Sequence, residues 1–382
     1  MLKDQLKNFT NHPTPFYFYD LNLLRHTLET VKTEADKYGF IVHYALKANV
    51  NQPILELMNS FGFGADCVSG NEVKRAIESG FPGHHVVFAG VGKSDEEIRF
   101  ALAQDIFCFN CESSHELEVL NELAAEQQTV ARVALRINPN VNAHTHHYIT
   151  TGLEENKFGI NMWEMEAVLA QLQQLKNIEL IGLHFHIGSQ ITDLEVFRNL
   201  CTRVNEIQQW FAARHIELPH INVGGGLGVD YYHPDTNPMP DFAAYFNLFH
   251  RFLELKPGQK LHFELGRALV AQCGTLVSKV LYIKKGINTN FAILDAGMTE
   301  LIRPALYQSY HKIENITSQD PEQKYDVVGP ICESSDCFGK AVMLPETKRG
   351  DLIAIRTAGA YGEVMSSAYN LREKAGAVYV GN

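Results

Sequence analysis

The chain has 382 residues, 45% of them hydrophobic, which is enough for one large and one smaller buried core. Its formal net charge of −11 argues against nucleic acid or an anionic membrane as a partner, because binding phosphate groups requires a basic surface. No stretch approaches the roughly 20 apolar residues of a membrane span, and residues 1–13 have no signal-peptide pattern. We therefore expect a soluble cytoplasmic protein.

Between residues 41 and 270 the chain alternates strand-like apolar runs with helical patterns. Each run ends in polar or glycine residues, and most are followed by a helical period. Eight such units fit the (β/α)₈ barrel in number and length. The predicted strands are Ile41–Leu46, Gly62–Val68, His85–Gly90, Ile106–Asn110, Ala131–Asn138, Glu179–His186, His220–Gly225 and Lys260–Leu265.

Lys47 stands at the carboxyl end of the first predicted strand. The active sites of these barrels lie at the carboxyl ends of the strands. A lysine amine forms a Schiff base with a carbonyl compound when burial or neighbouring cations leave it partly deprotonated. A single lysine is most often a solvated surface cation, so Lys47 is interpreted together with the other strand ends.

Strands six to eight end in groups that suit an aldehyde cofactor with a phosphate. Consecutive glycines let backbone N–H groups approach a phosphate, and the loops after strands seven and eight are its usual site in this barrel. A carboxylate at a strand end can keep a pyridine nitrogen protonated. The candidate residues at these strand ends are His184, His186, Ser189, Gly224, Gly225, Gly226, Glu264, Gly266 and Arg267.

Beyond Leu265 the pattern changes to short β-rich runs separated by turns, which predicts an all-β sandwich or small barrel. The aromatic run Thr14–Tyr19 is also strand-like and is expected to pair with it. We therefore expect a barrel domain at residues 26–268 and a β domain built from residues 1–25 and 269–382. The predicted strands are Leu269–Leu276, Lys279–Ile283, Phe291–Leu294, Lys324–Val328, Asp351–Thr357 and Ala377–Val380.

Taken together, the motifs resemble those of the fold-type III, alanine racemase-like pyridoxal-phosphate decarboxylases, and most closely the branch that acts on diaminopimelate. The similarity runs from about Thr14 to the C-terminus in the same order. The acidic pattern at residues 332–336 separates this branch from ornithine-type relatives. The matching stretches are residues 44–49, 151–153, 157–159, 184–189, 224–228, 264–267, 295–298, 301–307, 329–336 and 359–362.

The resemblance implies how the cofactor, pyridoxal 5′-phosphate, is bound. Lys47 would hold it covalently, His186 would stack on its ring, and Glu264 would face its pyridine nitrogen. The phosphate and its surroundings would be bound by the remaining matched residues, namely Ser189, Gly224, Gly225, Gly226, Gly266, Arg267 and Tyr361.

The resemblance also implies substrate and reaction. Arg267, Arg303 and Tyr307 would bind a substrate carboxylate, with Tyr361 nearby. Glu333 would bind the distal ammonium group, and Cys332 would donate the proton. Meso-2,6-diaminopimelate would lose carbon dioxide and give L-lysine, the last step of lysine biosynthesis. The enzyme would be a homodimer with shared active sites, because Cys332 and Glu333 would come from the partner subunit.

Two residues depart from the family pattern. Leu265 stands where proline usually fixes the φ angle before Gly266, and Thr299 stands where asparagine is common. Neither substitution removes a chemical group from the implied reaction.

Several alternatives remain open. Within the decarboxylases, the substrate could be ornithine, arginine or carboxynorspermidine. A metal-dependent barrel hydrolase would use paired histidines on one strand face, although we expect no metal. A cofactor carrier would not need the β domain, and a racemase would usually use a tyrosine base there. The histidines of the metal alternative are His184, His186, His144, His146 and His147.

The seven cysteines do not form an obvious disulfide framework in a chain of this size. Cys108 and Cys111 match the C-x-x-C pattern of redox or zinc sites. They lie on a predicted strand, where residues three apart point to opposite faces. The sequence therefore favours a pair of buried or edge cysteines.

Overall fold

The computed structural model describes residue 9, residues 11–141 and residues 157–381. The chain divides into two compact units. The barrel unit comprises Leu28–Gly228 and Asp241–Gly266, and the β unit comprises Met1–Thr27, Val229–Pro240 and Arg267–Asn382. The segment Val229–Pro240 therefore packs with the β unit, although it lies between two parts of the barrel in the sequence.

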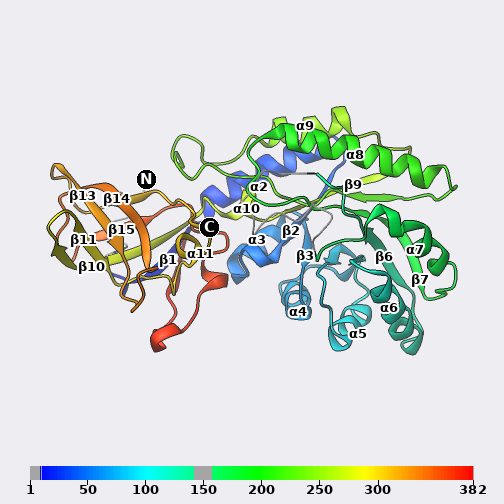
Figure 1. Cartoon of the computed structure of the whole chain (residues 1–382), viewed down its shortest axis with the longest axis horizontal. Coiled ribbons are helices and arrows are strands. Elements are labelled where there is room, and N and C mark those ends of the chain that lie inside the picture. The colour runs from blue at the N-terminus through cyan, green and yellow to red at the C-terminus, as the bar shows by residue number, and fades with distance from the viewer. Residues whose placement is uncertain (1–8, 10, 142–156, 382) are drawn as a thin grey trace. The chain divides into compact units, whose positions relative to one another are not determined.

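The barrel unit is closed by eight strands in sequence order, and the last strand pairs in parallel with the first. This confirms the predicted (β/α)₈ barrel (Figure 1). The carboxyl-terminal residues of each strand are buried because side chains fill the barrel and helices cover it. The strands are β2 (Ile41–Ala45), β3 (Gly64–Cys67), β4 (Val86–Phe88), β5 (Cys108–Cys111), β6 (Ala131–Arg136), β7 (Ile178–His184), β8 (His220–Asn222) and β9 (Lys260–Leu265).

Several barrel helices begin at a serine that follows the preceding strand closely. The side chains of Ser69, Ser94 and Ser113 each accept a backbone N–H at the start of their helix. Such a cap stabilises a helix by about 1 kcal/mol and fixes where the chain turns away from the strand end. The helices are α2 (Leu21–Asp36), α3 (Gln52–Ser60), α4 (Gly70–Glu78), α5 (Asp95–Ala103), α6 (Ser114–Glu126), α7 (Met165–Leu172), α8 (Leu194–Ala212) and α9 (Phe242–Phe252).

The β unit contains one mixed sheet, in the order β12-β15-β10-β11-β13-β14, to which β1 and β16 are added. Strand β1 pairs antiparallel with β10 and parallel with β16, which confirms the pairing predicted for Thr14–Tyr19. The elements are β1 (Phe16–Asp20), α10 (Arg267–Val270), β10 (Gly274–Lys285), β11 (Asn290–Leu294), α11 (Arg303–Tyr307), β12 (Ile313–Asn315), β13 (Glu322–Val328), β14 (Cys337–Pro345), β15 (Leu352–Ile355) and β16 (Gly376–Val380).

The strands of the β unit differ from the sequence-based ones in three places, one of which is the unpredicted three-residue strand β12. Strand β10 is one strand of 12 residues where two were predicted, and α10 precedes it. The two predicted runs were separated at Val277 and Ser278, and both residues are buried inside the continuous strand. Strand β14 was missed because it lies at the end of the sheet order and most of its residues are at least partly exposed.

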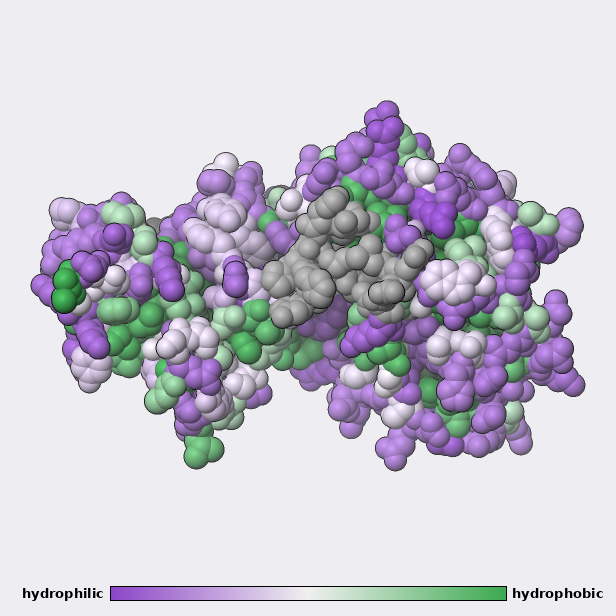
Figure 2. Space-filling model, in the orientation of Figure 1, coloured by the Kyte–Doolittle hydropathy of each residue, from purple (hydrophilic) through white to green (hydrophobic). Residues whose placement is uncertain are grey.

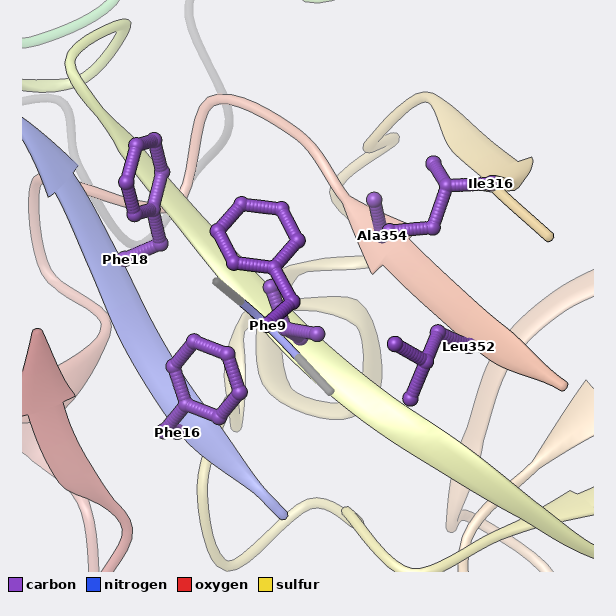
Figure 3. Packing of buried hydrophobic residues seen from close by; sticks show 7 residues of the cluster. Phe9, Phe16, Phe18, Ile316, Leu352 and Ala354 are labelled. Carbon is purple, nitrogen blue, oxygen red and sulfur yellow. The ribbon is translucent and has the colours of Figure 1, made fainter. Parts of the chain in front are cut away.

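An aromatic cluster ties the N-terminal strand into the sheet of the β unit (Figure 3). The ring centroid of Phe9 lies 4.9 Å from that of Phe18 and 5.7 Å from that of Phe16, both edge to face. Burying an apolar side chain of this size contributes about 1.5–3 kcal/mol. The cluster consists of Phe9, Phe16, Phe18, Val277, Ile316, Leu352 and Ala354.

Hydrophilic residues dominate the face shown in Figure 2, and hydrophobic areas lie between them. Among the helices that the structure describes, none is both long enough and apolar enough to cross a bilayer.

Candidate active site

Lys47 lies in the turn Leu46–Ala48 that directly follows β2, at the predicted strand end. Its Nζ atom is 3.2 Å from Oδ2 of Asp66, a fully buried carboxylate in β3. Burial and the Glu264 carboxylate raise the pKa of Asp66 to about 6, and Lys47 limits the rise. The ion pair holds the lysine amine at the barrel mouth. Asp66 is a site residue that the sequence analysis missed, although a carboxylate inside an apolar strand was a usable signal.

Glu264 lies in β9 and is buried. Its Oε1 accepts hydrogen bonds from Asn110 Nδ2 at 3.0 Å and Asn222 Nδ2 at 2.7 Å. Its Oε2 accepts from Nε2 of His184 at 3.0 Å. Burial alone would raise the pKa of Glu264, but the His184 imidazole lowers it below its ordinary value. A carboxylate has about four acceptor sites, so this ionised group can accept one further donor.

His186 follows β7 and is half-buried. Its Nδ1 accepts a hydrogen bond from the Gly225 backbone N–H at 3.4 Å. Burial and the positive charges of Lys47 and Arg136 lower the pKa of His186 well below its ordinary value. The ring is therefore a neutral imidazole held against the glycine turn.

The glycine turn after β8 is too crowded for other residues. A Cβ atom on Gly225 would collide with the carbonyl oxygen of Glu264, and one on Gly224 with that of Phe185. Gly224 and Gly226 also adopt positive φ angles of 69° and 102°. Glycine is therefore required here for the turn to pass close to the carbonyl oxygens of Glu264 and Phe185.

A buried ion pair supports the next part of the barrel mouth. Nη1 of Arg136, the last residue of β6, lies 2.6 Å from Oε1 of Glu112, whose Oε2 accepts the Gly159 N–H at 2.9 Å. The guanidinium carbon of Arg136 is 4.7 Å from the Phe158 ring centroid. The family-like motif at 157–159 therefore packs on the barrel mouth, whereas residues 151–153 lie outside the described residues.

The metal alternative finds no support in the described ranges. His184 donates to Glu264 and His186 accepts from Gly225, so each imidazole has another role. Within residues 9, 11–141 and 157–381, no three His, Cys, Asp or Glu side chains are grouped to hold a metal ion. The loop histidines of that alternative, His144, His146 and His147, lie outside the described residues.

In the β unit, Arg267 and Arg303 are 7% and 4% exposed. Nη1 of Arg267 donates to the Tyr231 hydroxyl at 2.7 Å, and its guanidinium carbon is 4.8 Å from the Tyr361 ring centroid. The guanidinium carbon of Arg303 is 5.3 Å from the Tyr231 ring centroid. Burial, and after it the charge of Arg267, lowers the pKa of Arg303. Tyr231 joins the two arginines and was missed by the sequence analysis.

Two further predicted residues belong to this arginine cluster. Tyr307, at the end of α11, and Tyr361 interact electrostatically with both guanidinium groups. Tyr361 has a positive φ of 55°, which is uncommon for a bulky residue and is often associated with functional sites. The structure thus brings Arg267, Arg303, Tyr307 and Tyr361 together within the β unit.

Cys332 and Glu333 lie exposed on a loop between β13 and β14. The Cys332 backbone N–H lies 3.5 Å from Oδ1 of Asn370. A hydrogen bond to Glu333 raises the pKa of Tyr369. The segment around residues 369–370 therefore lies beside this loop, and the side chains of Cys332 and Glu333 are exposed.

Asp336 holds the Cys332–Glu333 loop in place. Its Oδ1 accepts the Met298 N–H at 2.6 Å and its Oδ2 accepts the Ile331 N–H at 2.7 Å. A Cβ atom on Gly329 or Gly297 would crowd the same carboxylate, so glycine is required for this close approach. The carboxylate joins two motifs that are distant in the sequence.

Replacing Asp336 with asparagine is expected to displace this loop. One backbone N–H would face the amide NH₂ instead of an oxygen, which costs about 2 kcal/mol of unfolding free energy. Both the unfolding free energy measured by urea denaturation and kcat would decrease. Asp326→Asn is the control, because Asp326 accepts one exposed N–H from Ala341 in a neighbouring hairpin. Equal losses in the two variants would contradict the role of Asp336.

The two departures from the family pattern have structural uses. Leu265 is fully buried at the end of β9, where it pairs with Tyr44 of β2. Thr299 donates its hydroxyl to Oε2 of the buried Glu300 at 2.9 Å. Neither residue lies among the charged groups described above.

The C-x-x-C pair is structural, as the sequence favoured. Cys108 and Cys111 begin and end β5, both buried and both free, and burial raises the pKa of each thiol. All seven cysteines lie in the described residues, and none is in a disulfide. This agrees with the absence of a disulfide framework in the sequence.

Comparisons with known proteins point in one direction. The pyridoxal binding domain of the pyridoxal-dependent decarboxylases matches residues 22–271. A diaminopimelate decarboxylase of Bacteroides thetaiotaomicron is 60% identical over 369 residues, which is 96% of each chain. One of Helicobacter pylori is 42% identical over 370 residues, covering 96% of this chain and 90% of the relative.

Solved structures agree. The crystal structure of diaminopimelate decarboxylase from Helicobacter pylori complexed with L-lysine has a TM-score of 0.92 at 39% identity, covering 98% of this chain and 93% of that chain. The arginine decarboxylase of Paramecium bursaria Chlorella virus has a TM-score of 0.88 at 21% identity, covering 99% and 100%. At that identity the second likeness concerns the fold alone.

Proposed function

Because this chain belongs to the diaminopimelate decarboxylase family of pyridoxal-dependent decarboxylases, we propose that it converts meso-2,6-diaminopimelate to L-lysine and carbon dioxide. The observation that carries the chemistry lies in the barrel unit. A lysine amine at the end of β2 and a buried, ionised carboxylate in β9 stand on adjacent strands of the closed barrel. The reaction would be the last step of lysine biosynthesis.

The barrel groups fit pyridoxal 5′-phosphate. Lys47 provides the amine for covalent attachment, and the neutral imidazole of His186 suits stacking on an aromatic ring. Glu264 has one acceptor site left for a protonated pyridine nitrogen. The glycines of the turn Gly224–Gly226 carry no side chain, and Gly266 lies against Ala45 and Ala48 beside Lys47. We assign the phosphate to this turn together with Ser189 and Tyr361.

The β unit supplies groups for the substrate. The buried guanidinium of Arg303 has no ion-pair partner within the described residues, and its Nε has no hydrogen-bond partner there. A buried unpaired cation is costly unless an anion binds it. We therefore assign Arg303, with Arg267 and Tyr307, to a substrate carboxylate. The exposed carboxylate of Glu333 is assigned to the distal ammonium group.

Each residue then has one task in the reaction. When bound, pyridoxal phosphate would supply the electron sink that decarboxylation requires. Glu264 would keep the pyridine nitrogen protonated, and Lys47 would hold the cofactor covalently. The thiol of Cys332 donates a proton to the substrate carbon that has lost its carboxylate.

We also propose that the enzyme is a cytoplasmic homodimer in which Cys332 and Glu333 complete the active site of the other subunit. Both side chains lie exposed on the surface of their own chain, where a second copy could reach them. Analytical ultracentrifugation would report the dimer, and mixing Cys332→Ala with Lys47→Ala protein would restore activity through hybrid dimers.

The function is tested by product analysis. Protein supplemented with pyridoxal phosphate is incubated separately with meso-diaminopimelate, ornithine, arginine and carboxynorspermidine. We expect L-lysine and carbon dioxide from the first alone. Turnover of a different amine would overturn the substrate and keep the reaction type. No product from any of the four would overturn decarboxylation itself.

A further inference from the structure

We propose that Tyr231 is a positioning residue that holds Arg267 and Arg303 together as one carboxylate-binding pair. Tyr231 belongs to the segment Val229–Pro240, which packs with the β unit. The inference rests on the proposed function, because that function supplies a dicarboxylate substrate. The inference adds to the proposed function a residue that sets the positions of both guanidinium groups.

Tyr231 contacts both arginines, each in a different way. Its hydroxyl accepts the hydrogen bond from Nη1 of Arg267 at 2.7 Å. Its ring lies 5.3 Å from the guanidinium carbon of Arg303, within the range of a cation–π contact. Two buried like charges repel more strongly than they would in water. The phenol places an acceptor oxygen against one cation and the negative face of its ring near the other.

The ring of Tyr231 is itself held by a neutral histidine. The His311 ring lies edge to face with it, at a centroid distance of 5.1 Å and an angle of 81°. Nδ1 of His311 donates to the carbonyl oxygen of Arg356 at 2.9 Å, because a carbonyl only accepts. Burial, followed by the charge of Arg303, lowers the pKa of His311 to about 3. His311 therefore supports the tyrosine and adds no third positive charge.

The segment that carries Tyr231 is anchored on the same part of the β unit. Asp235 accepts from Nη2 of Arg356 and from Nζ of Lys312, each at 2.9 Å. Asp230 accepts the backbone N–H groups of Tyr232 and His233 at 2.8 and 3.0 Å. Arg356 thus contacts the segment through its side chain and His311 through its carbonyl. Tyr231 is therefore held by the His311 ring and by the ion pairs of Asp235 in its own segment.

The matched test compares two adjacent tyrosines. Tyr231→Phe keeps the ring and removes the hydroxyl, so KM for meso-diaminopimelate should rise about tenfold, the effect of one hydrogen bond to a charged group. The kcat should stay within about twofold, because the group acts through binding. Tyr232→Phe is the control, since Tyr232 is 61% exposed and stacks on Tyr310. It should match the parent in both constants.

A second readout does not depend on turnover. Calorimetry measures binding of pimelate, a seven-carbon dicarboxylate without amines, to the cofactor-loaded protein. Tyr231→Phe should weaken pimelate binding about tenfold, and Tyr232→Phe should not. Unchanged KM and pimelate affinity in Tyr231→Phe would overturn the inference, as would a parent that does not bind pimelate. A parent that binds pimelate without decarboxylating diaminopimelate would overturn the proposed function alone.

Discussion

Replacing Lys47 with alanine is expected to lower kcat by at least about 10³-fold, or ~4 kcal/mol of activation free energy. Alanine has no amine to carry the cofactor, and no described lysine other than Lys47 pairs with Asp66. Borohydride reduction followed by peptide mass mapping should find the cofactor mass on Lys47 in the parent. In the variant that peptide should carry no label.

Lys47→Arg separates covalent attachment from the ion pair. Arginine keeps a positive charge opposite Asp66, but a guanidinium is not a nucleophilic amine. We expect this variant to be as inactive as Lys47→Ala. It should also be more stable, because alanine leaves Asp66 buried without its cation. Appreciable turnover by Lys47→Arg, or labelling of another lysine, would contradict the assignment.

Acidification is expected to destabilise the fold by about 3 kcal/mol between pH 6.5 and pH 4 through His43 alone. Burial lowers the pKa of His43 from 6.5 to about 4. The folded state therefore keeps this imidazole neutral where the unfolded chain takes up a proton. The contribution of His43 to the unfolding free energy is fully present above pH 6.5. It falls as the pH drops toward 4, where His43 also becomes protonated in the folded state.

Burial is the main cause, and His43 is buried as part of a chain of hydrogen-bonded histidines inside the barrel unit. Nδ1 of His43 faces the carbonyl oxygen of His85 at 3.3 Å, so this nitrogen carries the proton. Its Nε2 then accepts from Nδ1 of His262, and Nε2 of His262 accepts from Nδ1 of His220, each at 2.9 Å. Only neutral rings at His43 and His262 can satisfy this sequence of bonds. Burial, with His43 and His220, lowers the pKa of His262 in the same direction.

Urea denaturation at pH 7.5, 6 and 5 measures this effect. His43→Gln keeps a polar side chain and removes the titrating ring, so its unfolding free energy should change less with pH than that of the parent. His115→Gln is the control, because the His115 side chain is 84% exposed on a helix surface. If the unfolding free energy changed equally with pH in the parent and in His43→Gln, the buried histidines would not cause the loss of stability in acid.

The sequence was sufficient for side chains whose position depends on a strand end. Lys47, His186, the glycine turn and Glu264 each follow or end an apolar run, and every barrel strand presents its carboxyl end at the same mouth. Knowing the strands was therefore enough to group these residues. The strand-end argument failed for Asp66, because its approach to Lys47 depends on the pairing of Ala45 with Asp66 across β2 and β3.

The β unit was harder to predict because its contacts join distant segments. Asp336 accepts a hydrogen bond from the backbone of Met298, 38 residues earlier in the chain. Tyr231 contacts Arg267 because its segment, Val229–Pro240, packs with the β unit although the residues on either side of it belong to the barrel unit. Strand β14 shows little alternation, since its residues are mostly exposed at the end of the sheet order. Contacts between such distant segments leave no periodic pattern in the local sequence from which they could be predicted.

The sequence by itself determined the barrel, the family motifs and the residue types that the chemistry needs, because these depend on local patterns. The tertiary structure alone decided which groups set the charge of those residues. Three donors around Glu264, the ion pair at Lys47 and the tyrosine between two arginines all arise from contacts between separate elements. Hydrogen bonds and burial act over a few ångströms in space, and residues that share them are far apart along the chain.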